Sequence, residues 1–169
     1  MSYDQNRGAV AIPSEWFEES RTKLSRLGGL DTGWDGFKAE PPSREALKQA
    51  GCVLRILHDI EFRPDRIDAS AEGGITFAFL AGNRYADIEC FNSGEILAVT
   101  SDRISEPTVW EVTSTESAIQ AASERLKVYV RRSPTGADVP KWPPAGSRFD
   151  IMVSLSGQPM DMHARCYAI

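Results

Sequence analysis

The carboxylates are the side chains whose spacing offers the most chemistry in this sequence. Asp87 and Glu89 are two residues apart in a segment of period-two hydrophobicity, so both should project from one face of a strand. Two carboxylates held close in unlike environments can act as a general acid and a general base. The simpler interpretation is that they solvate an exposed sheet face. A second acidic group, Asp31, Asp35 and Glu40, lies in an irregular segment, where acids are also common turn and cap residues.

The thiols and imidazoles are poorly placed for catalysis or metal binding. Cys52 and His58 belong to one predicted helix but lie about 240° apart around its axis, so they do not face each other. We interpret Cys52 as a packing residue and His58 as a neighbour of the helix's apolar stripe. Cys90, Cys166 and His163 complete the set without any Cys-x-x-Cys or His-x-x-x-His spacing. The sequence therefore predicts no metal site and no cofactor.

Hydrophobic periodicity predicts two helices ahead of the carboxylate pair. Ser14 should cap the first helix, which Gly28-Gly29 should end, and Ser43 should cap the second after Pro41-Pro42. The apolar positions recur every three or four residues: Phe17, Leu24 and Leu27 in the first helix, and Leu47, Ala50, Leu54 and Leu57 in the second. Pro64 limits the second helix.

From residue 67 the period changes to two, which predicts strands at about residues 67–70, 75–81, 84–91, 95–100 and 108–113. Gly82-Asn83 favours a tight hairpin. Pairing outward from this turn places six apolar residues on one face: Ile75, Phe77, Phe79, Ala86, Ile88 and Cys90. A third helix should follow a capping box formed by Thr113 and Glu116.

These elements predict an α+β fold, an antiparallel β-meander of four to five strands packed against two or three amphipathic helices. We expect a flexible N-terminus at residues 1–12 and a single domain at 13–132. Residues 133–169 are rich in proline and glycine. They are either a mobile tail or a segment that docks on the domain, with a short edge strand near residues 149–155.

The candidate binding residues lie on the outer face of the predicted sheet, meaning the side opposite the six apolar residues of the hairpin. Leu80, Tyr85, Leu97 and Val99 make this face half apolar, and we add Trp110 as a further aromatic contact. The loop residues Trp34 and Asp35 form a second candidate group. Trp34 is either an anchor for its loop or a platform for ligand stacking.

Bulk properties narrow the classes of protein. The chain has 169 residues and a net charge of -5, which argues against non-specific binding to nucleic acid or to an anionic membrane. Its one basic run is Arg125, Lys127, Arg131 and Arg132. No apolar stretch is long enough to span a bilayer, and the N-terminus lacks a secretory signal pattern. Three widely spaced cysteines fit a reducing compartment, so we expect a cytoplasmic protein.

Residues 30–81 carry a pattern that resembles small, uncharacterised accessory proteins of bacteria, phages and mobile elements. The pattern consists of Trp34-Asp35-Gly36, then Pro41-Pro42-Ser43 at a helix start, then Glu72-Gly73-Gly74-Ile75 leading into a strand. The resemblance implies a bacterial or mobile-element source and an order of helices followed by strands. It implies no activity.

We therefore expect a non-enzymatic binding module that contacts a protein partner, or a second copy of itself in a homodimer, through the outer face. The alternative is a small-molecule-binding protein or a small enzyme, with a pocket between the second helix and the sheet floored by Phe77 and Phe79. Nucleic-acid binding through the basic run is a third and weaker option, because the chain is acidic overall.

Overall fold

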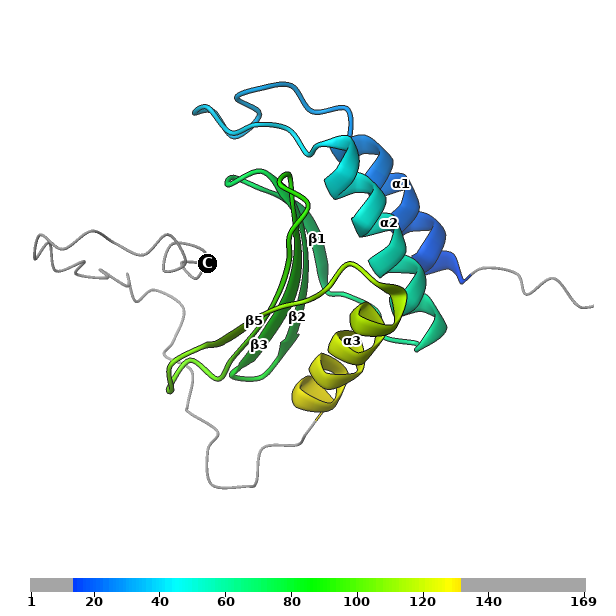
Figure 1. Cartoon of the computed structure of the whole chain (residues 1–169), viewed down its shortest axis with the longest axis vertical. Helices are drawn as coiled ribbons and strands as arrows, with labels where there is room; N and C mark the ends of the chain where they lie inside the picture. Colours follow the sequence, from blue (N-terminus) through cyan, green and yellow to red (C-terminus); the bar gives the residue numbers. More distant parts are fainter. Residues whose placement is uncertain (1–13, 132–169) are drawn as a thin grey trace, which may run out of the picture. The chain divides into compact units, whose positions relative to one another are not determined.

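The computed structural model describes residues 14–131 of the chain. These residues form three helices and a five-stranded antiparallel sheet, which confirms the predicted α+β class (Figure 1). The elements in chain order are α1 (Glu15–Leu27), α2 (Arg44–Asp59), β1 (Arg66–Ser70), β2 (Gly74–Ala81), β3 (Arg84–Phe91), β4 (Ile96–Ser101), β5 (Thr108–Glu111) and α3 (Glu116–Arg131). The expectations for residues 1–12 and 133–169, including an edge strand near 149–155, fall outside the described residues.

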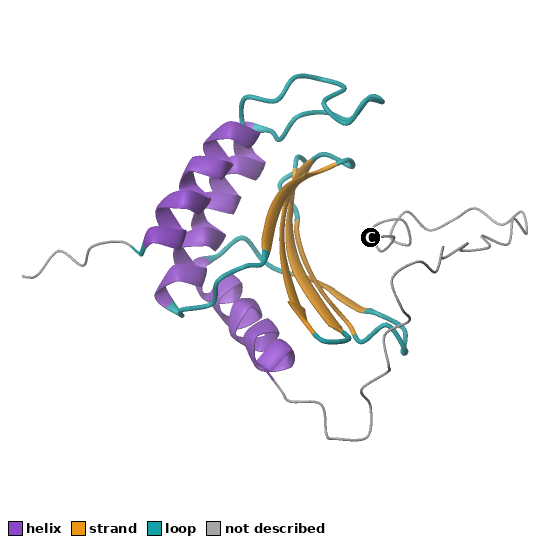
Figure 2. Cartoon of the chain, turned by 180° about the vertical axis from the view of Figure 1, so that it is seen from behind, coloured by secondary structure: helices purple, strands orange, loops and turns teal. Residues whose placement is uncertain are grey.

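The sheet is a simple meander in the order β1-β2-β3-β4-β5. All three helices lie against the same face of it, and the sheet curves so that its convex side meets the helices (Figures 1 and 2). The outer face is therefore the concave side. It carries none of the helices that the structure describes.

The central hairpin has the predicted register. Phe77 pairs with Ile88, and the same alignment pairs Phe79 with Ala86 and Ile75 with Cys90. Gly82 takes a φ of 61°, which suits the first central position of a two-residue hairpin turn. All six of these apolar residues are buried against the helices. Turn chemistry and the alternation of apolar residues thus determine which side chains remain on the outer face.

The core between helices and sheet is built from α2, α3 and the central strands. Its largest fully buried side chains include Phe77, Phe79, Leu54, Leu57, Ile75, Ile88, Ile96, Ile119 and Leu126. The rings of Phe62 and Phe79 stack with their centroids 4.0 Å apart. Phe77 and Phe79, expected to floor a pocket, are instead fully buried within this packed cluster.

The helix starts match the sequence only in part. Ser43 caps α2 as predicted, because its Oγ accepts a hydrogen bond from the Ala46 N–H at 3.1 Å. At α1 the backbone carbonyl of Ser14 accepts from the N–H of Phe17, while its side chain makes no cap bond. For α3 the predicted capping box at Thr113 was wrong. Thr115 takes that place, since its Oγ1 accepts from the N–H of Ala118.

The loop between α1 and α2 is tied to the β3–β4 turn by one side chain. Asn92 accepts a hydrogen bond from the Ser43 N–H at 2.6 Å and donates one to the Pro41 carbonyl at 2.9 Å. Gln49 of α2 adds a bond to the carbonyl of Gly94, at 2.6 Å. These bonds hold one end of the sheet against the start of α2.

Candidate functional site

The outer face is organised as rows of side chains that run across the strands. One row, from β1 to β5, is Arg66, Ala78, Asp87, Val99 and Val109; the next is Asp68, Thr76, Glu89, Leu97 and Glu111. Asp87 and Glu89 both belong to β3, the central strand, and each is the middle residue of its row. The two carboxylates therefore sit at the centre of the outer face.

Asp87 is almost completely removed from water, although it lies on the face that the helices leave bare. Its side chain has Ala78 and Val99 as cross-strand neighbours, and its exposed fraction is 4%. Burial raises the pKa of its carboxyl to about 7, the negative charge of Glu89 adds to this shift, and a hydrogen bond from Tyr85 opposes it. Its Oδ1 is buried without a hydrogen-bond partner. A carboxyl in this state is half ionised near neutral pH.

Glu89 repeats the arrangement one row further along β3. It is 7% exposed, with Thr76 and Leu97 as its cross-strand neighbours. Burial raises the pKa of its carboxyl, as does the negative charge of Glu72, whereas hydrogen bonds from Ser70 and Thr76 lower it. Its Oε1 is buried without a partner. The outer face thus carries two neighbouring carboxylates that each have one unsatisfied oxygen.

The apolar residues predicted for the outer face do lie there. Tyr85, Leu97 and Val99 are partly or fully buried around the carboxylates, and Leu80 at the hairpin end is 45% exposed. Val109 of β5, which was not among the predicted binding residues, belongs to the same face and is 40% exposed. Val109 lies directly opposite Val99 in the neighbouring strand, so the strand register places both residues on the same face. Apolar and acidic side chains are therefore interspersed on one surface.

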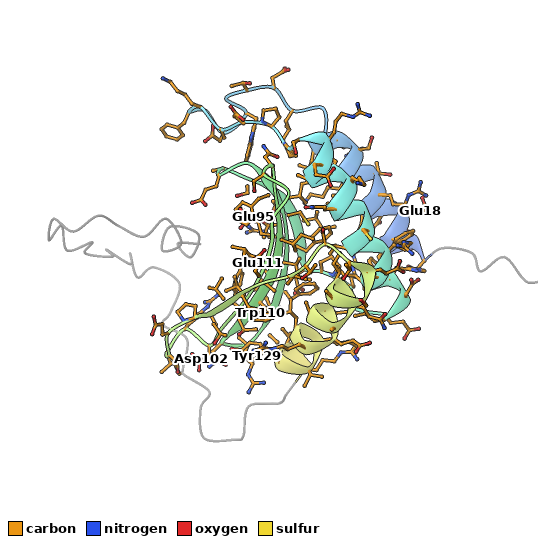
Figure 3. The ribbon with its side chains drawn as sticks, viewed as in Figure 1. Glu18, Glu95, Asp102, Trp110, Glu111 and Tyr129 are labelled. Carbon is orange, nitrogen blue, oxygen red and sulfur yellow. The ribbon has the colours of Figure 1, made fainter. Side chains whose placement is uncertain are left out.

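Trp110 lies on the opposite side of the sheet from the one predicted for it. It pairs with Ala98, which pairs in turn with Ile88, so its side chain belongs to the helix-covered face. There the guanidinium carbon of Arg125 in α3 lies 4.0 Å from the ring centroid. Trp110 and its neighbour Glu111 (both labelled in Figure 3) are successive residues of β5, so their side chains leave the strand on opposite faces. Trp110 is a packing residue under α3 and is not part of the outer face.

Trp34 and Asp35 hold their own loop in shape. The indole Nε1 of Trp34 donates to the carbonyl of Glu40 at 3.3 Å. Asp35 Oδ1 accepts from the N–H groups of Phe37 and Ala39, at 2.9 and 3.2 Å. These bonds support the anchor interpretation of Trp34 and give Asp35 the role of a turn residue.

The sequence places Asp87 and Glu89 on one sheet face but does not by itself identify them as a binding site. Alternation alone placed Asp87 and Glu89 on the outer face, where acids usually contact water. The burial of Asp87 is indicated by its cross-strand neighbours. Both hairpin registers were readable, and they put Ala78 and Val99 on either side of Asp87. An acid between two apolar cross-strand neighbours indicates burial.

The basic run of α3 is largely engaged within the fold. Lys127 donates to the carbonyl of Ile60, and Arg131 donates to that of Glu61 at 3.3 Å, where α2 ends. Arg125 covers Trp110, as described above. Arg132 lies outside the described residues. The cations that were considered for nucleic-acid binding therefore join α3 to α2 and β5.

Other polar groups in residues 14–131 offer little for catalysis or metal binding. Cys52 accepts a hydrogen bond from Arg55, and burial raises the pKa of the Cys90 thiol to about 12. His58 packs its ring against Phe17, with centroids 4.4 Å apart. The described residues contain no group of three or more histidine, cysteine or acidic side chains placed to hold a metal ion.

A shallow hollow of about 360 Å³ lies between α1 and α2, away from the sheet. Phe17, Leu24, Leu47 and Leu54 form its apolar lining, with Arg21 and Arg55 beside them. It contains none of the buried polar atoms that lack partners. The outer face is therefore the better candidate site.

Comparisons of the chain with protein-family models, with curated proteins and with solved structures found no match. Within residues 14–131, every helix is too short or too polar to cross a bilayer.

Proposed function

We propose that the protein is a non-enzymatic binding module that receives a partner protein on the outer face of its sheet. The supporting observation is that this face, which no helix of residues 14–131 covers, has a partly apolar, partly buried centre. Val99 and Ala78 are buried there, and Leu80 and Val109 extend the apolar surface toward solvent. An apolar surface with aromatic and polar members is typical of a protein-binding site.

The curvature of the sheet favours a partner over a second copy of the chain. The outer face is concave (Figures 1 and 2), and a concave surface is complementary to a convex element such as a helix. Two copies of the same concave face would meet only at their rims. Homodimer formation through this face is therefore the less favoured form of the proposal.

Capture from the source cell, combined with matched surface variants, tests the proposal. Leu80→Asp and Val109→Asp place a charge on exposed apolar positions of the outer face, so the fold should be retained. Val128→Asp is the control, because Val128 is 54% exposed on α3. We expect a partner that is captured by the wild type and by Val128→Asp but lost with either outer-face variant, with circular dichroism unchanged. Equal capture by all four proteins would exclude the outer face as the binding surface.

The second candidate is a small-molecule-binding protein or a small enzyme, now centred on Asp87 and Glu89. It is supported by the carboxyl of Asp87, whose pKa of about 7 suits proton exchange near neutral pH. A thermal-shift screen against metabolites tests it, since a ligand of the native state raises the melting temperature with concentration. Shifts that vanish in Asp87→Asn would favour this candidate, whereas a broad library without reproducible shifts would favour the interaction module.

We also propose a cellular location and a source for the protein, namely the cytoplasm of a bacterium or a mobile element carried by one. Free thiols at Cys52 and Cys90 are compatible with a reducing cytoplasm. The resemblance of residues 30–81 to accessory proteins of bacteria, phages and mobile elements suggests a source in which small interaction modules would be useful. Fractionation of the source cell tests the location.

A further inference from the structure

The unpaired oxygens of Asp87 and Glu89 point to the chemistry of the ligand. We infer that these two carboxylates form a binding site for an organic cation, the guanidinium or ammonium group of an arginine or lysine side chain that the partner inserts into the outer face. This inference rests on the proposed function, and it names the group that the partner must supply.

Burial without partners is the first argument. Asp87 Oδ1 and Glu89 Oε1 are both removed from water and both lack a hydrogen-bond partner. The two side chains are 4% and 7% exposed. An unsatisfied buried acceptor costs about 1–3 kcal/mol, and more when the group is charged. An unsatisfied buried acceptor in a native protein calls for an explanation, and a ligand that satisfies it when bound is one such explanation.

The arrangement of the pair is the second argument. Asp87 and Glu89 project from the same face of β3 at successive outward positions, so both carboxyl groups face the same side of the sheet. Because both are buried, a cation that enters from that side must displace neighbouring side chains, and it would then meet both groups. A guanidinium has five N–H donors in a planar fork, which can reach two carboxylates at once. The neighbouring Val99, Leu97 and Ala78 offer an apolar bed for the methylene stem of such a side chain.

Within residues 14–131, the nearby cations Arg66 and Lys23 pair with Asp68 and not with Asp87 or Glu89. Arg66 shares the row of Asp87, but its Nε donates to Asp68 at 2.7 Å. Asp68 also receives the ammonium of Lys23, at 3.2 Å. Glu72 and Glu111 add further negative charge around Glu89. The surroundings of the pair therefore favour a cationic ligand over an anionic one.

A side-chain cation suits the site better than a metal ion. Metal sites made by a protein generally use three or more ligands, and residues 14–131 provide no such cluster here. The second side of the site is apolar, which a hydrated metal ion would not fill. An arginine or lysine side chain fits both the acidic and the apolar part of the site. Its charged end would contact the two carboxylates, and its methylene stem would pack on Val99 and Leu97.

A titration of the full-length, isotope-labelled protein tests the inference. The probe is the peptide acetyl-Gly-Arg-Gly-amide, whose side chain carries its one charge, and the control is the same peptide with neutral citrulline. We expect amide chemical shifts in β2, β3 and β4 to respond to the arginine peptide and far less to the citrulline peptide. The titration is run at low salt and at about pH 8, where the carboxyl of Asp87 is ionised.

Three isosteric variants locate the interaction. Asp87→Asn and Glu89→Gln should each weaken the arginine response about tenfold, since each removes a charge-assisted hydrogen bond. Glu111→Gln removes an exposed carboxylate from the same row as Glu89 and should change the affinity less than twofold. Equal responses to both peptides, no response to either, or equal losses in all three variants would overturn the inference.

Partner capture by the same variants distinguishes a failure of the cation site from a failure of the proposed function. If Asp87→Asn and Glu89→Gln capture the partner as well as the wild type does, while Leu80→Asp does not, the cation site is wrong and the binding module stands. If the arginine response depends on both carboxylates but Leu80→Asp leaves partner capture intact, the cation site stands and the partner binds elsewhere.

Discussion

At the scale of single residues, Asp87 and Glu89 are expected to lower the stability of the fold, because each is a buried carboxyl with one unsatisfied oxygen. Each could be replaced by a threonine or valine that fits a sheet better and needs no hydrogen-bond partner. Burial raises the pKa of both carboxyls, so the fold opposes their ionisation. Residues that are held in an unfavourable state typically mark a site that a ligand or a reaction uses.

This view predicts how Asp87 affects stability with pH. Its pKa is raised from 3.8 in the unfolded chain to about 7 in the folded one, so the folded state binds the proton more tightly. Stability from the protonated group is complete below about pH 4 and is lost as the pH rises through about 7. Asp87→Asn should therefore raise the free energy of unfolding by about 1–3 kcal/mol at pH 8 and by much less at pH 4.

Urea unfolding of the wild type and the variant at both pH values measures this difference. Glu111→Gln is the control, because Glu111 is an exposed acid of the same face. A gain in Asp87→Asn that is the same at both pH values would show that ionisation of Asp87 is not what destabilises the fold.

At the scale of elements, the side chain of Asn92 holds the α1–α2 loop to the sheet. Its two bonds, to Ser43 and Pro41, each involve a partly buried backbone group. Asn92→Ala would leave the Ser43 N–H and the Pro41 carbonyl unpaired, and we expect it to lower the free energy of unfolding by about 2–3 kcal/mol. Ser93→Ala, in the same turn but exposed, should cost well under 1 kcal/mol. Equal losses in urea unfolding would contradict the role of Asn92.

Two glycines should respond in opposite ways to alanine. Gly51 lies within α2, and an added Cβ would meet nothing within 4 Å, so Gly51→Ala should raise stability by about 0.5–1 kcal/mol. Gly74 opens β2 with a φ of 149°, and an added Cβ would lie 2.3 Å from the carbonyl oxygen of Cys90. Gly74→Ala should therefore cost about 3 kcal/mol or more, because backbone atoms must shift. Thermal unfolding of both variants checks the pair, and two shifts of the same sign would contradict it.

The elements were predictable where local chemistry decides the structure. The Gly82 turn and the apolar alternation of β2 and β3 determined the hairpin register, and Ser43 marked the start of α2. The prediction was wrong where two neighbouring residues could both serve as the helix cap, and where tertiary packing determines the position of a side chain. Thr113 and Thr115 both precede α3 with suitable side chains, and only the path of the chain after β5 selects Thr115. Trp110 looked available because nothing in its own segment shows that α3 covers it.

At the scale of the whole described domain, α3 completes the core, and no helix of residues 14–131 lies on the other face of the sheet. Its cations bind the end of α2 through the carbonyls of Ile60 and Glu61, and Arg84 of β3 donates to the carbonyl of Tyr129 at 2.8 Å. These contacts fix α3 on the convex side of the sheet, with Trp110 beneath it. The basic side chains of α3 are thus used within the fold, while Asp87, Glu89 and Glu111 remain on the outer face.

This division of faces predicts that the purified protein is a monomer. A stable interface buries about 800 Å² on each partner, and two concave faces that both carry Asp87, Glu89 and Glu111 would bury little area and repel each other. Light scattering should therefore give a mass near 18.6 kDa over a wide range of concentration, for the wild type and for Leu80→Asp, Val109→Asp and Val128→Asp alike. A doubled mass that falls to the monomer value in Leu80→Asp and Val109→Asp, but not in Val128→Asp, would instead identify a second copy of the chain as the occupant of the outer face.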